Sequence, residues 1–243
     1  MVLIESLKIT GQQAATNCNL SMDSGRRICY VAPRKYSALL SSDSENIDTG
    51  LGLTRKLSGS NGNGGALMRQ TSGKIEKNVE MFEGKRVLEI GFCTGLHSVF
   101  AFANGASSVT LHSLDATTLN SFVKPTLRRN NVPRNRSKFS SGDLESFKMV
   151  LNNQKFDVIL AAELISTDES EFEAIHDMLN AALAPNGIVL FSARPYYDHC
   201  SGSLPTFLDL VKMKGCFDAD IRWTSTKTDV APRKVVQLNR SIR

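Results

Sequence analysis

The 243-residue chain is 41% hydrophobic and 22% charged, which suits one α/β domain with an N-terminal extension and a core of ordinary size. It contains no run of the roughly 18 apolar residues that a membrane span needs, and its first residues lack the pattern of a signal peptide. The five cysteines show neither CxxC nor Cys/His spacing, so neither a zinc site nor a disulfide framework is indicated. The net charge of +5 comes from Lys and Arg scattered along the sequence, which is a weak argument for an acidic partner. We expect a cytoplasmic or nuclear protein with no membrane or metal partner.

The first 71 residues differ in composition from the rest of the chain. The apolar pattern of Arg27–Ala32 predicts one short strand. Residues 41–65 are rich in Ser, Gly and Asn and show no period, so they cannot bury enough apolar surface to offset the entropy of ordering. We therefore expect an N-terminal extension over 1–71, partly disordered with a linker at 41–65, and a domain over 72–243.

From residue 72 the apolar pattern becomes regular, beginning with a short amphipathic helix that carries Ile75, Val79 and Phe82. Pro185-Asn-Gly187 is interpreted as a turn that leads into a strand. Strands are predicted at Arg86–Ile90, Val109–Leu111, Lys138–Ser140, Phe156–Ala161, Ile188–Ser192, Phe217–Trp223 and Lys234–Leu238. Helices are predicted at Leu96–Asn104, Ala116–Asn130, Leu144–Leu151, Glu169–Leu183 and Pro205–Lys214.

This alternation of strands and helices indicates an α/β fold. We expect an open, mostly parallel sheet of seven strands with helices on both faces, as in Rossmann-like domains. No convincing helix separates the last two strands, so an antiparallel hairpin is expected to close the sheet.

A glycine turn, Gly91–Gly95, joins the first strand of this domain to its helix. A strand followed by a glycine turn and a helix start is how nucleotide-like ligands are held, because the backbone can approach closely and offers free N–H groups. Glu89, at the carboxyl edge of the sheet, would suit a ligand's ammonium group. A GxxxG pattern alone also arises by chance or through helix packing, but its position after an apolar strand strengthens the prediction.

Polar side chains also follow the second and third strands. Asp115 can bind ribose hydroxyls if its strand ends late, and otherwise Ser113 takes that place; the alternative role of Asp115 is a helix N-cap. Asp143 can accept a hydrogen bond from an adenine amino group or cap the next helix, and these two roles are compatible.

The fourth and fifth strands end in residues that suggest a substrate site. Glu163 would be a costly charge at the mouth of a buried strand, so it is either a substrate-facing polar group or a partner in a local hydrogen bond. Tyr196, Tyr197 and His199 gather in the loop after the fifth strand. His199 is either a general base or a solvated side chain. The sequence has no nucleophile elbow and no P-loop, which disfavours nucleotide hydrolysis.

Four segments resemble the landmarks of the seven-strand S-adenosylmethionine-dependent methyltransferases: VLEIGFCTG, FSSGD, FDVILAAEL and PNGIVLFSARPYY. The resemblance covers residues 60–240 and is closest to the protein histidine methyltransferases and the related small protein-lysine methyltransferases. It implies S-adenosylmethionine as cofactor and a protein substrate.

The resemblance also implies roles for the residues named above. Carried over by position, Glu89, Gly91 and Gly95 would line the methionine part of the cofactor. Asp115 or Ser113 would face its ribose, and Asp143 would face its adenine. Glu163 would lie near the substrate, and Tyr196 and Tyr197 would form a wall of the site for the methyl acceptor.

Several positions depart from the family pattern: Cys93 replaces a glycine, Ser113 replaces the ribose-binding acid, and Ser166 replaces a tyrosine. Met68 and Arg69 also stand where the family has a tryptophan. The leading hypothesis is a protein N-methyltransferase that acts on histidine before lysine. The alternative is a catalytically weak or inactive member that serves as a binding module. A nucleic-acid substrate is disfavoured because no Asn-Pro-Pro-Tyr-type tetrad follows the fourth strand, although nucleic acid can enter through a substrate complex.

Overall fold

The computed structural model describes residues 15–21, 27–33, 79–225 and 232–242. The predicted linker at 41–65, the predicted boundary at residue 71 and the start of the helix at Ile75 lie outside these residues.

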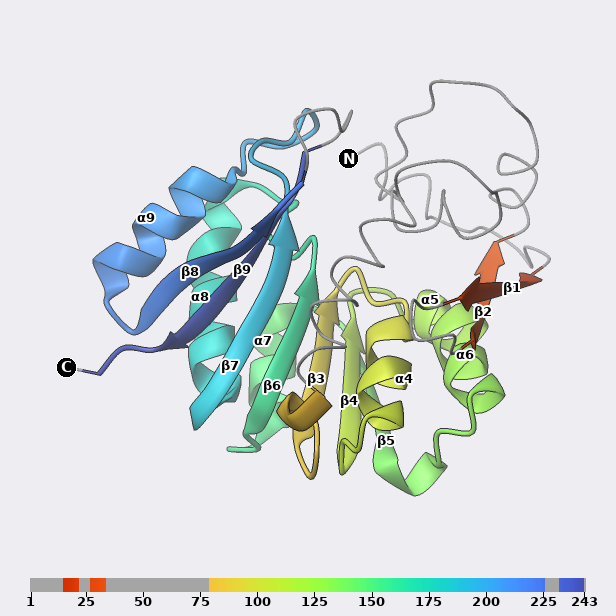
Figure 1. Ribbon diagram of the computed structural model, residues 1–243. Helices are drawn as coiled ribbons and strands as arrows, with labels where there is room; N and C mark the ends of the chain where they lie inside the picture. Colours follow the sequence, from red (N-terminus) through yellow and green to blue (C-terminus); the bar gives the residue numbers. More distant parts are fainter. Residues whose placement is uncertain (1–14, 22–26, 34–78, 226–231, 243) are drawn as a thin grey trace.

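The main sheet has seven strands in the order β5-β4-β3-β6-β7-β9-β8. The strands are β3 (Arg86–Gly91), β4 (Ser108–Ser113), β5 (Ser137–Ser141), β6 (Phe156–Ala162), β7 (Leu183–Ala193), β8 (Phe217–Thr224) and β9 (Lys234–Arg240). Strands β5 through β7 pair in parallel, whereas β9 pairs antiparallel with both β7 and β8. The predicted mostly parallel sheet and its antiparallel close are confirmed (Figure 1).

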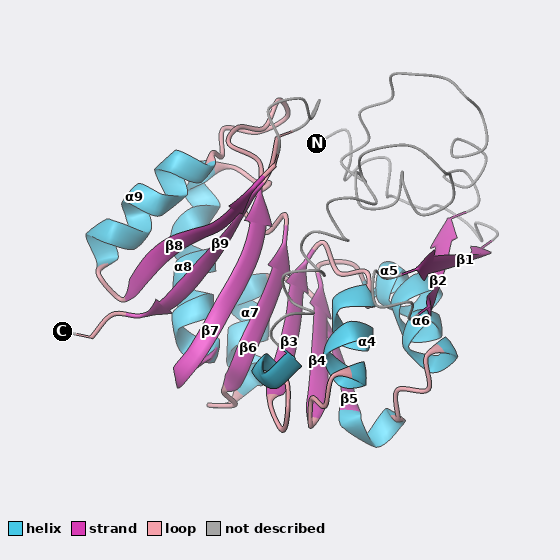
Figure 2. Cartoon of the chain, viewed as in Figure 1, coloured by secondary structure: helices cyan, strands magenta, loops and turns pink. Residues whose placement is uncertain are grey.

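Helical segments connect these strands. They are η1 (Val79–Met81), α4 (Leu96–Ala103), α5 (Ala116–Thr118), η2 (Leu119–Val123), α6 (Lys124–Arg129), η3 (Arg134–Arg136), α7 (Leu144–Leu151), η4 (Glu169–Glu171), α8 (Phe172–Ala182) and α9 (Leu204–Lys214). Helices α4 and α6 cover one face of the sheet, and α7, α8 and α9 cover the other, as expected (Figure 2).

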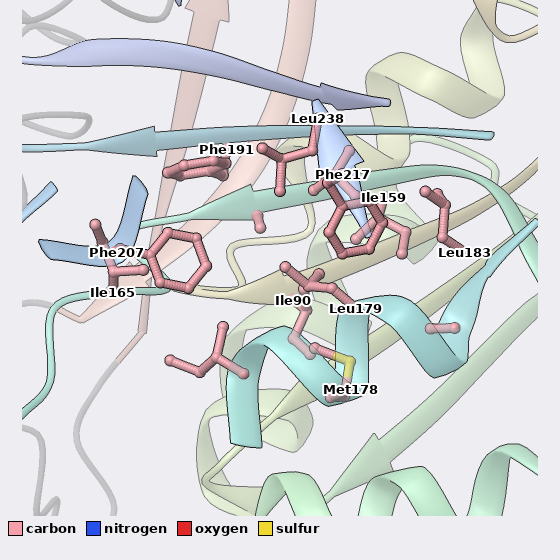
Figure 3. Packing of buried hydrophobic residues seen from close by; sticks show 14 of the residues in the cluster. Ile90, Ile159, Ile165, Met178, Leu179, Leu183, Phe191, Phe207, Phe217 and Leu238 are labelled. Carbon is pink, nitrogen blue, oxygen red and sulfur yellow. The ribbon is translucent and has the colours of Figure 1, made fainter. Parts of the chain in front are cut away.

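The core consists of one apolar layer on each side of the sheet, because the central strands are buried on both faces. On the face that α8 covers, Ile90 and Ile159 of β3 and β6 lie over Met178 and Leu179 (Figure 3). Farther along this layer, the ring of Phe207 meets that of Phe191 edge to face, with centroids 5.6 Å apart. Burying a side chain of this size stabilises the fold by about 1.5–3 kcal/mol.

Two of the differences from the sequence prediction are each explained by a proline. The expected continuous helix Ala116–Asn130 contains a five-residue π-helical turn, η2, which ends just before Pro125. Proline lacks an N–H and crowds the carbonyl of the preceding turn, so the helix widens there. Pro185-Asn-Gly187 is not a turn before a strand. Strand β7 already begins at Leu183, and the proline segment bulges between the pairings of Leu183 and Ile188 with β6.

The N-terminal part of the described chain forms a hairpin of β1 (Ala15–Ser21) and β2 (Arg27–Pro33), of which the sequence predicted only the second strand. The hairpin packs on α6: Val31 N donates to Thr126 Oγ1 at 3.1 Å, and Asn130 exchanges hydrogen bonds with both backbone groups of Cys29. Its apolar side chains join the core layer of α4 and α6. This part of residues 1–71 therefore packs on the domain.

Candidate active site

The carboxyl ends of the parallel strands form the candidate site. The chain order reverses between β3 and β6, because β4 and β5 lie on one side of β3 while β6 and β7 lie on the other. Loops that leave such a switch point diverge and open a crevice, where open α/β sheets bind their ligands. The polar residues predicted from the sequence all lie at the ends of β3 through β7.

Glu89 turns inward and holds the glycine turn together. Its Oε1 accepts hydrogen bonds from the N–H groups of Thr94 at 3.0 Å and Gly95 at 2.9 Å, and its Oε2 accepts one from Ser98 N at 2.9 Å. His97 Nδ1 lies 3.4 Å from Oε1. Burial opposes ionisation, but the hydrogen bonds from His97 and Ser98 outweigh it and lower the pKa of Glu89. The carboxylate is 1% exposed and satisfies the start of α4, which has no capping side chain of its own.

The two glycines of the turn are required by packing within the protein. Gly91 has a φ of 84°, and a Cβ there would collide with the carbonyl oxygen of Ala162 on β6. Gly95 has a φ of 78°, and a Cβ there would lie 2.8 Å from the side chain of Leu127. Between them, Cys93 is buried in the core layer beneath α4. Contacts within the protein alone therefore hold the turn tightly against β6 and α6.

Asp115 caps a helix. Its carboxylate accepts hydrogen bonds from Thr117 N at 2.9 Å, and from the N–H and hydroxyl of Thr118 at 2.8 Å each. Burial raises the pKa of Asp115, but these hydrogen bonds outweigh it and lower the pKa below its usual value. The N-cap role of Asp115 is confirmed, and its role toward a ribose stays a prediction. Ser113 ends β4, and its hydroxyl accepts a hydrogen bond from Asp115 N at 3.3 Å.

Asp143 is the N-cap of α7, as its position predicted. One carboxylate oxygen accepts the Ser146 N–H at 2.6 Å, and the other accepts the Ser146 hydroxyl at 2.9 Å. These bonds lower the pKa of Asp143. The carboxylate is exposed and has about four acceptor positions, so the cap leaves room for further partners. Beside it, Gly142 has a φ of 128° and open space where a Cβ would stand.

Glu163 lies at the mouth of β6 in a buried ion pair. Its Oε1 accepts a hydrogen bond from Arg233 Nε at 2.9 Å, and its Oε2 accepts one from the Tyr197 hydroxyl at 3.1 Å. The side chains of Glu163 and Arg233 are only 11% and 7% exposed. Its backbone has a φ of 51°, and its N–H donates to Ser192 O at 3.0 Å. The carboxylate thus joins the ends of three strands, β6, β7 and β9.

Arg233 was missed by sequence reasoning. It lies 70 residues from Glu163 in the chain and belongs to none of the recognised motifs. A carboxylate at the end of a buried strand implies a cationic or hydrogen-bonding partner, but the sequence does not indicate which one.

Tyr196 and Tyr197, predicted to line one wall, lie on opposite sides of their loop. Tyr197 is buried, and its hydroxyl also accepts a hydrogen bond from Arg194 N at 3.1 Å. Burial and the charge of Glu163 raise the pKa of Tyr197, so that it stays a neutral donor to the carboxylate. Tyr196 is 72% exposed and faces solvent.

The loops that follow β6 and β7 are tied together beside this cluster. His199 Nε2 lies 3.0 Å from Ser166 Oγ, so this histidine is not merely solvated. Asp168 accepts hydrogen bonds from the N–H and hydroxyl of Ser201 at 3.0 and 3.1 Å. The candidate acceptor region therefore has a defined wall built from two loops.

The described residues form two groups of polar side chains along the edge. Glu89 and Ser113 lie at the ends of β3 and β4 and Asp143 follows β5, while Glu163 and Tyr197 follow β6 and β7. Nowhere in the described ranges do three or more His, Cys, Asp or Glu side chains gather in a way that could hold a metal ion. The helices of the same ranges include none long and apolar enough to cross a membrane.

Comparison with known proteins identifies the family. A family model described as lysine methyltransferase matches residues 65–212. This chain belongs to the lysine methyltransferase family. It is an S-adenosylmethionine-dependent methyltransferase, and S-adenosylmethionine is its cofactor.

Two curated relatives of this methyltransferase differ in how much of it they cover. An uncharacterized protein of Caenorhabditis elegans, F22B7.9, is 42% identical over 236 residues, which are 94% of this chain and 95% of that protein. A histidine protein methyltransferase 1 homolog of Dictyostelium discoideum is 30% identical over 139 residues, 57% of this chain but only 44% of that protein.

Solved structures support the fold. A Streptococcus mutans protein assigned as a SAM-dependent methyltransferase superposes with a TM-score of 0.61 at 16% identity, over 95% of this methyltransferase and 57% of that chain. An O-methyltransferase from Bacillus cereus in complex with SAH gives a TM-score of 0.53 at 14% identity, over 70% and 81%. Likeness at such identities shows a shared fold.

The residues at the edge fit the cofactor. The open space beside Gly142 and the exposed carboxylate of Asp143 can receive an adenine amino group, and Ser113 has a hydroxyl at the strand end where ribose is bound in such folds. Two acidic residues at this edge differ in how directly they can contact the cofactor. The carboxylate of Glu89 is buried on backbone N–H groups, whereas Asp115 Oδ1 accepts one hydrogen bond and keeps an acceptor position for a ribose hydroxyl.

Proposed function

We propose that this methyltransferase transfers a methyl group from S-adenosylmethionine to a side-chain nitrogen of a protein substrate, histidine in preference to lysine. The observation that carries this proposal is the buried cluster of Glu163, Arg233 and Tyr197 at the mouth of β6. The name of the Dictyostelium relative supports the same substrate residue.

The cofactor would lie across the ends of β3, β4 and β5. Glu89, Gly91 and Gly95 shape the turn against which its methionine part rests, with Glu89 acting through the backbone. Ser113 faces the ribose and Asp143 accepts from the adenine amino group. Asp115 acts through the loop that it caps. When bound, the cofactor supplies an electrophilic methyl group for in-line displacement by the acceptor nitrogen. The protein must mainly hold donor and acceptor in line, about 3 Å apart.

The charges around the site proposed for the methyl acceptor favour an acceptor side chain that is neutral when it binds. To bind here, a lysine ammonium group would need a carboxylate that has no other cationic partner. Glu163 already has such a partner, because Arg233 Nε lies 2.9 Å from its Oε1. A second cation brought beside this pair would be poorly stabilised in a low-dielectric site. A neutral imidazole needs only a hydrogen-bond acceptor for its N–H, and each Glu163 oxygen keeps one free acceptor position beside its present bond.

Glu163 would then hold the imidazole by the N–H opposite the reacting nitrogen. As that nitrogen gains a methyl group and S-adenosylhomocysteine leaves, the opposite N–H becomes acidic, and Glu163 takes its proton, so that no second cation remains beside Arg233. Tyr197 and Arg233 fix the carboxylate in place for this task. Tyr196, exposed on the rim, is available to the surface of the protein substrate.

The test compares binding and turnover in one pair of variants. Glu163→Gln should lower the rate of methyl transfer by about 100-fold or more, the usual effect of removing a general base. Its affinity for S-adenosylhomocysteine, measured by calorimetry, should stay within about twofold of wild type, because the cofactor lies over other strands. Glu171→Gln, which changes an exposed carboxylate on η4, should leave both quantities unchanged. Undiminished turnover in Glu163→Gln would remove the proposed role.

A second candidate is a binding module with weak or no turnover. The observation in its favour is that the carboxylates of Glu89 and Asp115 are both committed to backbone N–H groups. The same calorimetric titration separates the candidates. A wild-type protein that shows no heat of binding up to about 1 mM S-adenosylhomocysteine would support the binding module and contradict the enzyme.

A further inference from the structure

The positive charge of the protein is concentrated on one part of its surface, although Lys and Arg look scattered in the sequence. Residues 15–21, 27–33 and 116–142 contain no Asp or Glu. They contain Arg27, Lys124, Arg128, Arg129, Arg134, Arg136 and Lys138, here called the basic face. These seven cations exceed the net charge of +5 for the whole chain, so all other residues together carry −2.

The fold brings these segments together at the β5 end of the sheet. Figure 1 shows β1, β2 and α6 on the side of the molecule where β5 ends the sheet. Val31 bonds to Thr126 and Cys29 to Asn130, so β2 runs antiparallel to α6 and carries Arg27 past the end of that helix.

Two cation–π contacts join the basic face across elements. Lys124 Nζ lies 5.3 Å from the ring centroid of Phe139 on β5, and the Arg136 guanidinium lies 6.0 Å from that of Phe102 on α4. Lys138, next to Phe139 in the edge strand, points to the opposite side of the sheet. The charges thus wrap around one rim of the domain.

The charges of the basic face are available to a partner. Six of the seven side chains are exposed, and Lys124 is half-buried. Within residues 15–21, 27–33, 79–225 and 232–242, no ion pair holds any of the seven. An uncompensated cluster of this kind attracts a polyanion over a distance of about 10 Å at moderate ionic strength.

The composition of the basic face favours nucleic acid over an acidic protein. Protein interfaces depend on apolar and aromatic anchors, yet none of the large exposed apolar side chains of the described residues lies in these segments. Five of the seven cations are arginines, which bind phosphate through two parallel hydrogen bonds. Exposed Asn131 and Asn135 alternate with the arginines and can bond to 2′-hydroxyl groups, which DNA lacks.

We propose that the basic face binds the backbone of double-helical RNA. Residues 15–21, 27–33 and 116–142 carry no exposed aromatic ring on which single-stranded bases could stack, so phosphates and 2′-hydroxyls along a duplex are the chemistry that the basic face matches. This inference does not depend on which amino acid is methylated.

The test is fluorescence anisotropy of the full-length protein with a labelled RNA duplex of about 20 base pairs. With about four phosphate contacts, raising the salt from about 50 to about 200 mM should weaken binding roughly 100-fold. The variant Arg129→Glu/Arg134→Glu should bind at least about 10-fold more weakly at intermediate salt. The matched control Lys148→Glu/Lys212→Glu makes the same change in net charge on the opposite face and should stay within about twofold of wild type.

Three results would overturn the proposal. Equal losses in both variants would mean that net charge alone drives binding. Equal affinity for a DNA duplex of the same sequence would remove the assignment to RNA. Tighter binding of a poly-glutamate peptide would identify an acidic protein as the partner. Both variants should retain the wild-type circular dichroism spectrum, since the four replaced side chains contribute nothing to the core.

Discussion

At the residue scale, His112 is a buried imidazole for which the described residues provide no hydrogen-bond partner. It lies one residue before the end of β4, is 1% exposed, and stacks on Phe147 with ring centroids 4.0 Å apart. Within the described chain, neither ring nitrogen has a hydrogen-bond partner. Burial disfavours the imidazolium and lowers the pKa of His112 from 6.5 to about 4.

This histidine should make stability depend on pH. Between pH 6.5 and about 4 the unfolded chain binds a proton at His112 and the folded protein does not, so the free energy of unfolding falls as the pH drops. From about pH 7 to about pH 5 the loss from this residue should be about 2 kcal/mol. Urea unfolding of His112→Leu should show a pH dependence smaller by that amount. An equal loss in wild type and variant would contradict the account.

At the element scale, the hairpin of β1 and β2 depends on one asparagine. Asn130 Oδ1 accepts the Cys29 N–H at 3.1 Å, and its Nδ2 donates to Cys29 O at 2.6 Å and to Thr126 O at 2.8 Å. An isolated two-stranded hairpin is marginal in water, so these bonds to α6 help to fix it in place. They also orient the part of β2 that carries Arg27.

Removing this side chain should loosen the hairpin. Asn130→Ala should destabilise the protein by about 2 kcal/mol, because two backbone groups of β2 lose their partners. Amide hydrogen exchange at Cys29 and Val31 should become faster, while exchange in β3 and β6 should not change. Asn135→Ala, at an exposed position on η3, is the control and should behave like wild type. Unchanged exchange at Cys29 in Asn130→Ala would show that packing alone holds the hairpin.

The elements themselves were largely predictable, and the failures have local causes. Apolar runs such as Phe156–Ala162 and amphipathic stretches such as Phe172–Ala182 determine the sheet and its helices because burial follows their period. Strand β1, ATNCNLS, was missed because asparagine is rare in strands and β1 is stabilised by its pairing with β2. The bulge at Pro185 was mistaken for a turn because the same residues favour both.

The candidate site was predictable in position but not in its contacts. Any acid at the end of a parallel strand lies at the carboxyl edge, which places Glu89 and Glu163 correctly without a structure. The direction in which each carboxylate points depends on its partners, which the sequence does not identify. Glu163 points toward Arg233, a residue distant in sequence. Glu89 points toward the backbone N–H groups of Thr94 and Gly95 in its own loop.

At the scale of the whole molecule, the sheet separates three tasks. The ends of β3 to β5 form the proposed cofactor site, the ends of β6 and β7 with the start of β9 hold the neutralised Glu163, and the β5 rim carries the uncompensated positive charge. Six of the seven cations of the basic face lie within residues 124–138, and the fold adds Arg27 from a segment about 100 residues away.

The central claim is that this methyltransferase modifies histidine at a site whose carboxylate is already neutralised. The most direct test is mass spectrometry of lysate proteins after incubation with the wild-type protein and a methyl donor labelled with a heavy isotope. The account predicts that the label appears on histidine side chains and that Glu163→Gln removes it. Label confined to lysine side chains, or label that persists in Glu163→Gln, would contradict it.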